Sequence, residues 1–140
     1  MSKRIEELFL FDIYVAILKI QKTVEKFENS EELLHDFNAW DSVIREFEII
    51  GEAARHLIGS NILDENARVV VDFRNLLIHN YFGIDPEEVW DVVINDLPYF
   101  TNDILDQINK IEELLKKELI EAYCEHNKYL DFVIEKLQVL

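Results

Sequence analysis

The sequence predicts an all-α fold, an up-and-down bundle of four to five helices. Apolar residues recur at steps of three and four almost from end to end, which is the period of amphipathic helices. Only three Gly and two Pro occur among 140 residues, and no segment alternates with a period of two between hairpin turns. A chain of this length forms one domain with a buried core. We therefore expect a single domain over residues 1–140, with 119–140 as a C-terminal helical extension.

Two long helices are predicted at the start of the chain, over about residues 4–27 and 31–58. Asn29 or Ser30 can cap the second helix, because short polar side chains accept hydrogen bonds from the free N–H groups of a first helical turn.

A third helix is predicted after Asp64, which is a good capping residue, and its apolar pattern continues to Ile78. The run Val69–Val71 alone would also suit a strand. Its neighbours carry the helical period over a length that strands seldom reach, so we favour a helix.

A fourth helix is predicted to begin at Asp85 and Pro86, which combine an acidic N-cap with a proline at the first helical position. Pro98 must kink or restart this helix, because proline lacks the N–H group that an interior position requires. The pattern resumes after Pro98 as far as Leu115, and the tail over residues 120–140 is again helical.

The chain is strongly acidic. Fourteen Lys and Arg stand against 29 Asp and Glu, a formal net charge of −15. This charge repels a phosphate backbone at long range and argues against an extended nucleic-acid-binding surface. Any contact with RNA must therefore be local.

The expected location is the cytoplasm. The single cysteine, Cys124, cannot form an internal disulfide, which favours a reducing compartment. The N-terminus becomes acidic where a signal peptide would become apolar, and no apolar run approaches the ~18 residues of a membrane-spanning helix. We expect no contact with a membrane.

Four polar side chains gather near the end of the third predicted helix: Arg74, Asn75, His79 and Tyr81. Arginine offers a fixed cationic fork to a phosphate, histidine moves protons near neutral pH, and an amide orients a hydroxyl or water. Without further information, an arginine and a histidine in one helix more often belong to a solvated surface. At ~100° per residue, Arg74 and His79 diverge by ~140°. We therefore hypothesise that two copies of the chain pool these groups in one cleft.

The same residues carry a resemblance to a known family. The segment Arg74–Tyr81 resembles the R-x4-6-H motif of HEPN ribonucleases, and more narrowly the R-x4-H-x-Y form of HepT-like toxins. Glu46–Ala54 resembles the family's E-x-I-G-E-A helix, and Val89–Trp90 with Asn95–Pro98 resembles the helix after the motif. The similarity covers about residues 4–118, and three blocks in order are far more specific than one short motif.

The resemblance implies a metal-independent endoribonuclease that acts as the toxin of a type VII-like toxin-antitoxin system, with a homodimeric site and no cofactor. His79 would be the acid/base group, Arg74 would bind the phosphate, and Asn75 would position the substrate. Tyr81 corresponds to the tyrosine that a MntA-like nucleotidyltransferase antitoxin modifies with AMP in this family.

Two acidic residues are predicted to support the site. Glu52 lies within an apolar segment and Asp12 within an apolar stripe, so either could face Arg74 or a helix end and orient the arginine. Cys124 and His126 lack a second ligand pair at zinc-like spacing, so no metal site is predicted.

Two further histidines, His35 and His56, have no such partner and are expected to be solvated. Two alternatives to a ribonuclease remain open from the sequence. One is a non-catalytic HEPN module that presents Tyr81 to a nucleotidyltransferase, and the other is a purely structural helical partner.

Overall fold

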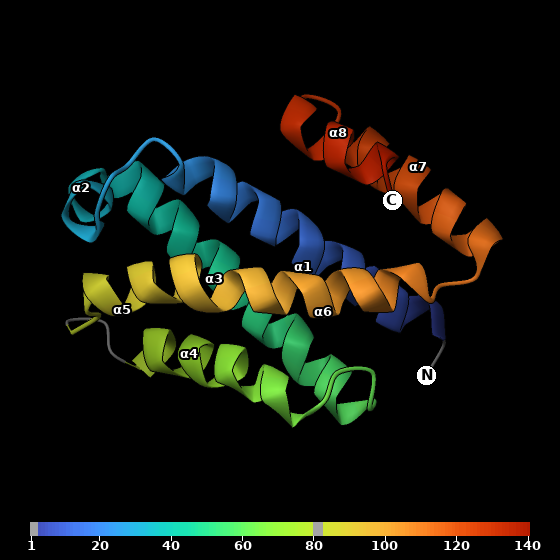
Figure 1. Ribbon diagram of the computed structural model, residues 1–140, viewed down its shortest axis with the longest axis horizontal. Helices are drawn as coiled ribbons and strands as arrows, with labels where there is room; N and C mark the ends of the chain where they lie inside the picture. The colour runs from blue at the N-terminus through green and yellow to red at the C-terminus, as the bar shows by residue number, and fades with distance from the viewer. Residues whose placement is uncertain (1–2, 80–82) are drawn as a thin grey trace.

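The computed structural model describes residues 3–79 and 83–140, and every regular element within them is helical (Figure 1). This confirms the predicted all-α fold. The elements are α1 (Lys3–Val24), α2 (Ser30–His35), α3 (Phe37–Gly59), the 3₁₀ turn η1 (Glu65–Ala67), α4 (Arg68–His79), α5 (Pro86–Asp91), the π-helical η2 (Val92–Asp96), α6 (Leu97–Asn109), α7 (Glu113–His126) and α8 (Asp131–Gln138).

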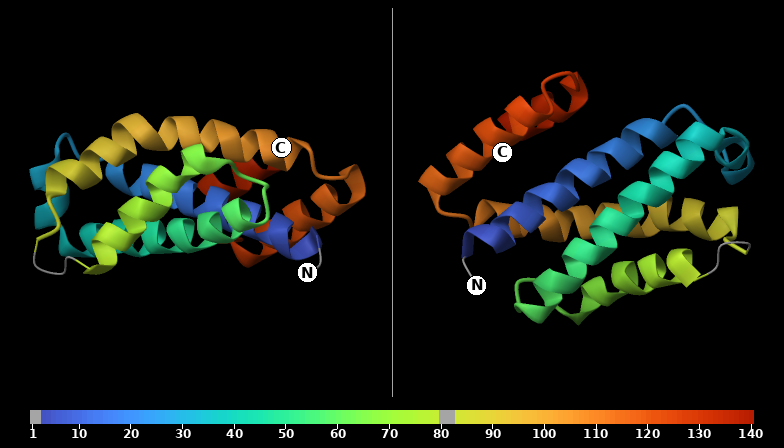
Figure 2. Two further views of the ribbon diagram at one scale, coloured as in Figure 1. Left: turned by 90° about the horizontal axis from the view of Figure 1, so that it is seen from below. Right: turned by 180° about the vertical axis from the view of Figure 1, so that it is seen from behind.

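Four helical stretches form an up-and-down bundle. α1, α3, α4 and the continuous run from α5 to α6 follow one another with alternating direction (Figures 1 and 2). α3 packs against both α1 and α4, while α6 packs against α1. α7 and α8 form a helical pair beside α1 (Figure 1). Among the described residues, no helix is both long and apolar enough to cross a membrane.

α1 is the central helix of the molecule. Every residue from Leu10 to Leu18 is buried except Asp12, which is partly exposed. A helix that is apolar on all sides must be covered on all sides, and α3, α6, α7 and α8 all contact α1. The C-terminal helices therefore complete the core around α1, through buried residues such as Leu119, Val133 and Leu137.

Tyr123 of α7 explains why an acidic residue interrupts the apolar face of α1. Its hydroxyl donates a hydrogen bond to Oδ1 of Asp12 at 2.6 Å and lies 3.1 Å from the carbonyl oxygen of Leu8. Its ring stacks on Phe11 with centroids 5.2 Å apart. Burial, together with the neighbouring Asp12 carboxylate, raises the pKa of Tyr123 well above its usual value. The hydroxyl therefore stays protonated and joins α7 to α1.

Tyr123→Phe is expected to destabilise the protein by about 1.5–3 kcal/mol, because it removes a hydrogen bond to a charged group and keeps the ring on Phe11. Chemical denaturation at an unchanged m-value would measure this loss. Tyr129→Phe is the matched control, since Tyr129 is 86% exposed and its change should stay within about 0.5 kcal/mol. Equal losses in the two variants would show that the Asp12 bond contributes nothing to stability.

The prediction of a single helix over residues 31–58 was wrong, because the helix is interrupted at Asp36. Asp36 has an extended backbone (φ −97°, ψ 92°) and its side chain accepts a hydrogen bond from the N–H of Ala39, so it caps α3. The short α2 before it is capped by Asn29, one of the two predicted caps, which accepts from the N–H of Glu32. The apolar period continues across this break, and for that reason the pattern alone conceals it.

The predicted start of the fourth helix is confirmed, since the Asp85 side chain accepts a hydrogen bond from the N–H of Glu87 and Pro86 opens α5. The predicted irregularity at Pro98 takes the form of a π-helical segment. In η2 the N–H of Leu97 donates to the carbonyl of Val92, five residues back. Such a turn loosens the helix just ahead of the proline, and regular α geometry restarts in α6.

The helix after Pro98 ends earlier than predicted. α6 stops at Asn109 instead of continuing to Leu115. Glu112 caps a new helix, because its carboxylate accepts hydrogen bonds from the N–H groups of Leu114 and Leu115, both at 3.0 Å. These two bonds lower the pKa of Glu112.

Glu46 on α3 is a buried carboxylate, 7% exposed. Burial raises its pKa, and the positive charges of Lys19 and Arg45 oppose this effect in part. A carboxyl whose pKa is raised by folding contributes stability below its unfolded pKa and loses that contribution as the pH rises. The charged form of Glu46 therefore opposes folding near neutral pH.

Glu46→Gln is expected to raise the thermal midpoint near pH 7. The gain should shrink as the pH falls towards the ordinary range of a glutamate, about 4.3, because the wild-type carboxyl then becomes neutral as well. Thermal melts from pH 4 to pH 8 would measure it, with the exposed Glu48→Gln as the control. A gain that grew on acidification would contradict the assigned cause.

Candidate active site

Arg74 of α4 crosses α3 at a glycine. A Cβ added to Gly51 would lie 2.2 Å from Cβ and 2.5 Å from Cγ of Arg74, well inside van der Waals contact. Glycine in the middle of a helix is unfavourable by about 1 kcal/mol relative to alanine. Here it permits a close approach of α3 and α4, which places the stem of Arg74 directly over the backbone of α3.

The guanidinium of Arg74 reaches Glu52, the next residue of α3. Nη2 of Arg74 lies 3.3 Å from Oε2 of Glu52. The other carboxylate oxygen, Oε1, accepts from Nη2 of Arg55 at 2.7 Å and lies 3.6 Å from Nε2 of His56. The hydrogen bond from Arg55 lowers the pKa of Glu52, and the charges of Arg55, Arg74 and His56 lower it further. Glu52 therefore stays ionised and fixes Arg74.

Asn75 holds the other arm of the same guanidinium. Its Oδ1 accepts a hydrogen bond from Nη1 of Arg74 at 3.2 Å. Nε of Arg74 is buried and has no hydrogen-bond partner within the described part of the chain. Each terminal nitrogen carries two N–H groups, and the only one that donates to a described residue is the Nη1 group bonded to Asn75, so others remain for an anion beside the ion pair with Glu52.

His79 lies at the last residue of α4 and its side chain is exposed, whereas only 26% of the Arg74 side chain is exposed where it packs on α3. The two groups thus stand in different surroundings on one helix, as their angular separation in the sequence suggests. Tyr81 lies outside the described residues.

The two predicted supporting acids differ in what they contact. Glu52 pairs with Arg74, but its side chain is 42% exposed and so is less buried than its apolar neighbours suggest. Asp12 is bonded to Tyr123 at 2.6 Å. Both acids line one cleft of about 380 Å³ between α1 and α3, whose other lining residues are Phe9, Arg45, Glu48, Ile49 and Ala53.

Sequence reasoning missed two partners of Glu52. Arg55 and His56 both contact its carboxylate, and the ring of His56 also stacks on Phe9 with centroids 4.9 Å apart and planes 4° apart. His56 is exposed, as predicted, with 42% of its side chain accessible, but it also has these two contacts. Its position four residues after Glu52, with Arg55 three residues after, is the helical spacing of ion pairs and could have revealed the cluster.

Comparisons with known proteins show the family of the chain. The family described as "Ribonuclease HepT-like" matches residues 13–105, which include Arg74, Asn75 and His79. Two of the relatives from Methanocaldococcus jannaschii show the extent of the similarity. "Putative RNase MJ0127" is 37% identical over 83% of this chain and 92% of its own length, and "Putative RNase MJ1380" is 33% identical over 74% and 97%.

A third relative, "Probable ribonuclease HepT" of Thermococcus cleftensis, is 34% identical over 69% of this chain and 89% of its own length. No solved structure gives a significant match. The family match covers well over half of the chain, and these relatives are covered almost completely. The chain therefore belongs to the HepT-like ribonuclease family.

Proposed function

We propose that this protein is a metal-independent endoribonuclease that cleaves RNA through Arg74, Asn75 and His79. The observation that carries the proposal is the fixed arginine, whose stem lies over Gly51 and whose guanidinium forms an ion pair with Glu52 and a hydrogen bond to Asn75. A guanidinium oriented in advance can stabilise negative charge without reorganising during the reaction. The names of the relatives, all described as ribonucleases, support RNA as the substrate.

The reaction requires no group beyond those of the chain and the RNA. The ribose 2′-oxygen forms a bond to the adjacent phosphorus while a base removes its proton. The bond from phosphorus to the 5′-oxygen then breaks, and that oxygen takes up a proton, which leaves a 2′,3′-cyclic phosphate. His79 acts as the acid/base group, Arg74 neutralises charge on the phosphate, and Asn75 positions the substrate.

A homodimer would bring these groups together. Within one chain Arg74 packs on α3 while His79 is exposed at the end of α4. A second copy that meets the first near these helix ends would offer its His79 to the phosphate that Arg74 of the first copy binds. Two equivalent composite sites follow from a two-fold axis.

Control by a partner fits the position of Tyr81, two residues after His79. We include in the proposal that a MntA-like nucleotidyltransferase antitoxin transfers AMP to this tyrosine, so that the protein is the toxin of a toxin-antitoxin pair. An added nucleotide places negative charge beside the site, where it repels the RNA phosphates. Neutralisation then requires no change of fold.

Cleavage of RNA by the purified protein in EDTA tests the proposal. We expect fragments that end in a 2′,3′-cyclic phosphate, and a specific activity that falls when dilution separates the dimer. Fragments with a 3′-hydroxyl and a 5′-phosphate would rule out attack by the 2′-oxygen. A complete lack of cleavage would contradict the proposal that the protein is a ribonuclease.

A non-catalytic module is the second candidate, and one observation favours it. Arg74 is already paired with the carboxylate of Glu52, in a chain of net charge −15, so an RNA phosphate must compete with an internal acid. Transfer of AMP to Tyr81 by a MntA-like enzyme, with no RNA cleavage before or after it, would support this candidate.

A further inference from the structure

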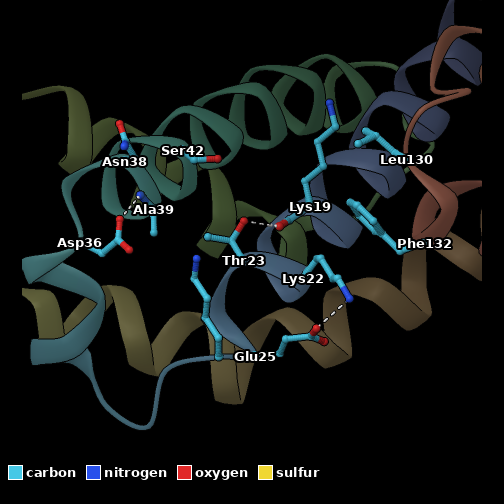
Figure 3. A pocket seen from close by; sticks show the side chains of 11 residues that line it. Lys19, Lys22, Thr23, Glu25, Asp36, Asn38, Ala39, Ser42, Leu130 and Phe132 are labelled. Carbon is cyan, nitrogen blue, oxygen red and sulfur yellow. Dashed lines mark hydrogen bonds and ion pairs between the residues drawn. The ribbon is translucent and has the colours of Figure 1, made fainter.

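A groove of about 730 Å³ lies at the other end of the α1 and α3 pair from Arg74 (Figure 3). Its walls come from the C-terminal half of α1, the first turns of α3 and the segment that enters α8. Figure 3 shows Lys19 and Lys22 on one side of it, with Asn38 and Ser42 across from them. None of the predicted site residues that the structure describes lines this groove.

The groove gathers cations in an acidic chain. Lys19 and Lys22 lie three residues apart on α1, as residues on one helical face do, and Lys26 lies in the turn that follows α1. All three line the groove. Two acids also line it, and both are engaged: Glu25 pairs with Lys22 at 2.9 Å, and Asp36 caps α3. The lining carries three lysines against two acids, whereas acids outnumber bases by about two to one in the whole sequence.

Two of the three lysines are available to a ligand. Within the described ranges, no carboxylate lies within 4.0 Å of the amine of Lys19 or Lys26. The buried carboxyl of Glu46 feels the charge of Lys19 from farther away, and Lys26 stands 5.2 Å from the ring centroid of Phe27.

The groove also offers an apolar surface on which a nucleobase of RNA could stack. Phe132 and Leu130 line it from the α8 side, and the amine of Lys22 lies 5.8 Å from the centroid of the Phe132 ring. Cations beside an aromatic ring are the combination that binds single-stranded nucleic acid, since phosphates pair with the amines and a base stacks on the ring. The exposed side chains of Asn38 and Ser42 can hydrogen-bond to sugar or phosphate oxygens.

We propose that this groove binds a single-stranded segment of the RNA substrate, at a distance from the bond that is cleaved. The inference rests on the proposed ribonuclease function. Asn38 in the groove and Glu52 beside Arg74 are 14 residues apart on α3, which corresponds to about 21 Å along the helix and about 40° around it. The groove and the arginine therefore lie on similar sides of one helix.

The cleft between these two ends is acidic. Asp12, Glu48 and Glu52 line it against the single base Arg45, so phosphates are repelled there. RNA contacts are then confined to the lysine groove and to Arg74, which agrees with the expectation that a chain of this charge contacts RNA only locally.

The test compares two charge-matched double variants. Lys19→Gln/Lys26→Gln removes the two available cations of the groove, and Lys116→Gln/Lys117→Gln removes two cations from α7, outside the groove. Fluorescence anisotropy measures binding of a labelled single-stranded oligonucleotide whose 2′-hydroxyls are methylated, so that it cannot be cleaved. Each lost phosphate contact lowers the salt dependence of log K by about 0.7 for a single strand.

For the groove variant we expect that slope to fall by about 1.4 and the affinity to fall roughly 10- to 30-fold near 0.1 M salt. The α7 variant should bind within about twofold of wild type. Cleavage adds a second readout, because KM should rise for long RNA and stay unchanged for a dinucleotide. Equal losses of affinity in both variants would overturn the proposal. So would a groove variant that keeps its affinity for the oligonucleotide and loses only its binding to a polyglutamate peptide, used as a second anionic probe.

The binding measurement does not depend on turnover. If the wild type cleaves no RNA while only the groove variant loses affinity, the groove stands as an RNA site and the catalytic proposal fails. If the wild type cleaves RNA and the groove variant binds and cleaves like it, the groove is not a substrate site. Thermal melts of both variants verify that neither substitution unfolds the chain.

Discussion

Replacing His79 by alanine is expected to lower kcat for RNA cleavage by about 10²- to 10⁴-fold, the usual contribution of a positioned acid/base group. Arg74→Ala should lower it by about 10²- to 10³-fold, as for the loss of one group that stabilises transition-state charge. His79 is exposed at a helix end, so its replacement should leave the thermal midpoint almost unchanged. His35→Ala, also exposed, is the matched control and should retain full activity.

Mixing the two inactive variants tests whether the site is shared between chains. If Arg74 of one copy acts with His79 of the other, a dimer of one Arg74→Ala chain and one His79→Ala chain holds one intact site. An equimolar mixture that exchanges subunits freely should then recover about one quarter of wild-type activity, because half of the dimers are mixed and each has one working site. No recovery, with exchange verified by differently tagged chains, would place both groups in one chain.

Arg74→Lys separates the charge of the arginine from its shape. Lysine keeps the positive charge but loses the planar fork that pairs with Glu52 through one arm and hydrogen-bonds Asn75 through the other. We expect an activity between those of wild type and Arg74→Ala. A lysine variant as active as wild type would show that only the charge matters.

The fold could be predicted from the sequence wherever local signals decide it. The helical period, the cap at Asn29, the start at Asp85 and the irregularity at Pro98 are all local features. The break at Asp36 is different, because the apolar pattern continues through it. α2 packs on α5, and the hydroxyl of the buried Ser30 donates to Glu87, 57 residues away. Contacts between distant segments thus hold the short separate helix in place, in addition to the local cap at Asp36.

The candidate site divides in the same way. Arg74, Asn75 and His79 could be predicted from one short segment of sequence. Glu52 could be predicted to support them because it is an acidic residue among apolar ones. The partner of Asp12 is Tyr123, 111 residues later in the chain, and no local pattern indicates it. The function of Gly51 also depends on a helix crossing, since only the structure shows Arg74 directly above it.

Gly51→Ala is the most informative change outside the reacting groups. The added methyl would lie 2.2 Å from Cβ of Arg74, and because a Cβ cannot swing away, α3 and α4 must separate. Overpacking of this kind costs about 1–3 kcal/mol, and alanine returns about 1 kcal/mol of helix propensity. We expect a modest fall in the thermal midpoint together with a loss of activity of up to about 10²-fold, since small displacements of a positioning group lower rates that much.

Two comparisons separate displacement of Arg74 from general damage. Gly59→Ala is the matched control, because an added Cβ there meets no atom within 4 Å, and it should be neutral or slightly stabilising. If Gly51→Ala acts on catalysis only through Arg74, it should lower activity no further in an Arg74→Ala background. Its effect on stability should persist there, since alanine keeps the Cβ that the new methyl meets. A fully active Gly51→Ala protein would mean that the crossing of α3 and α4 does not position the arginine for the reaction.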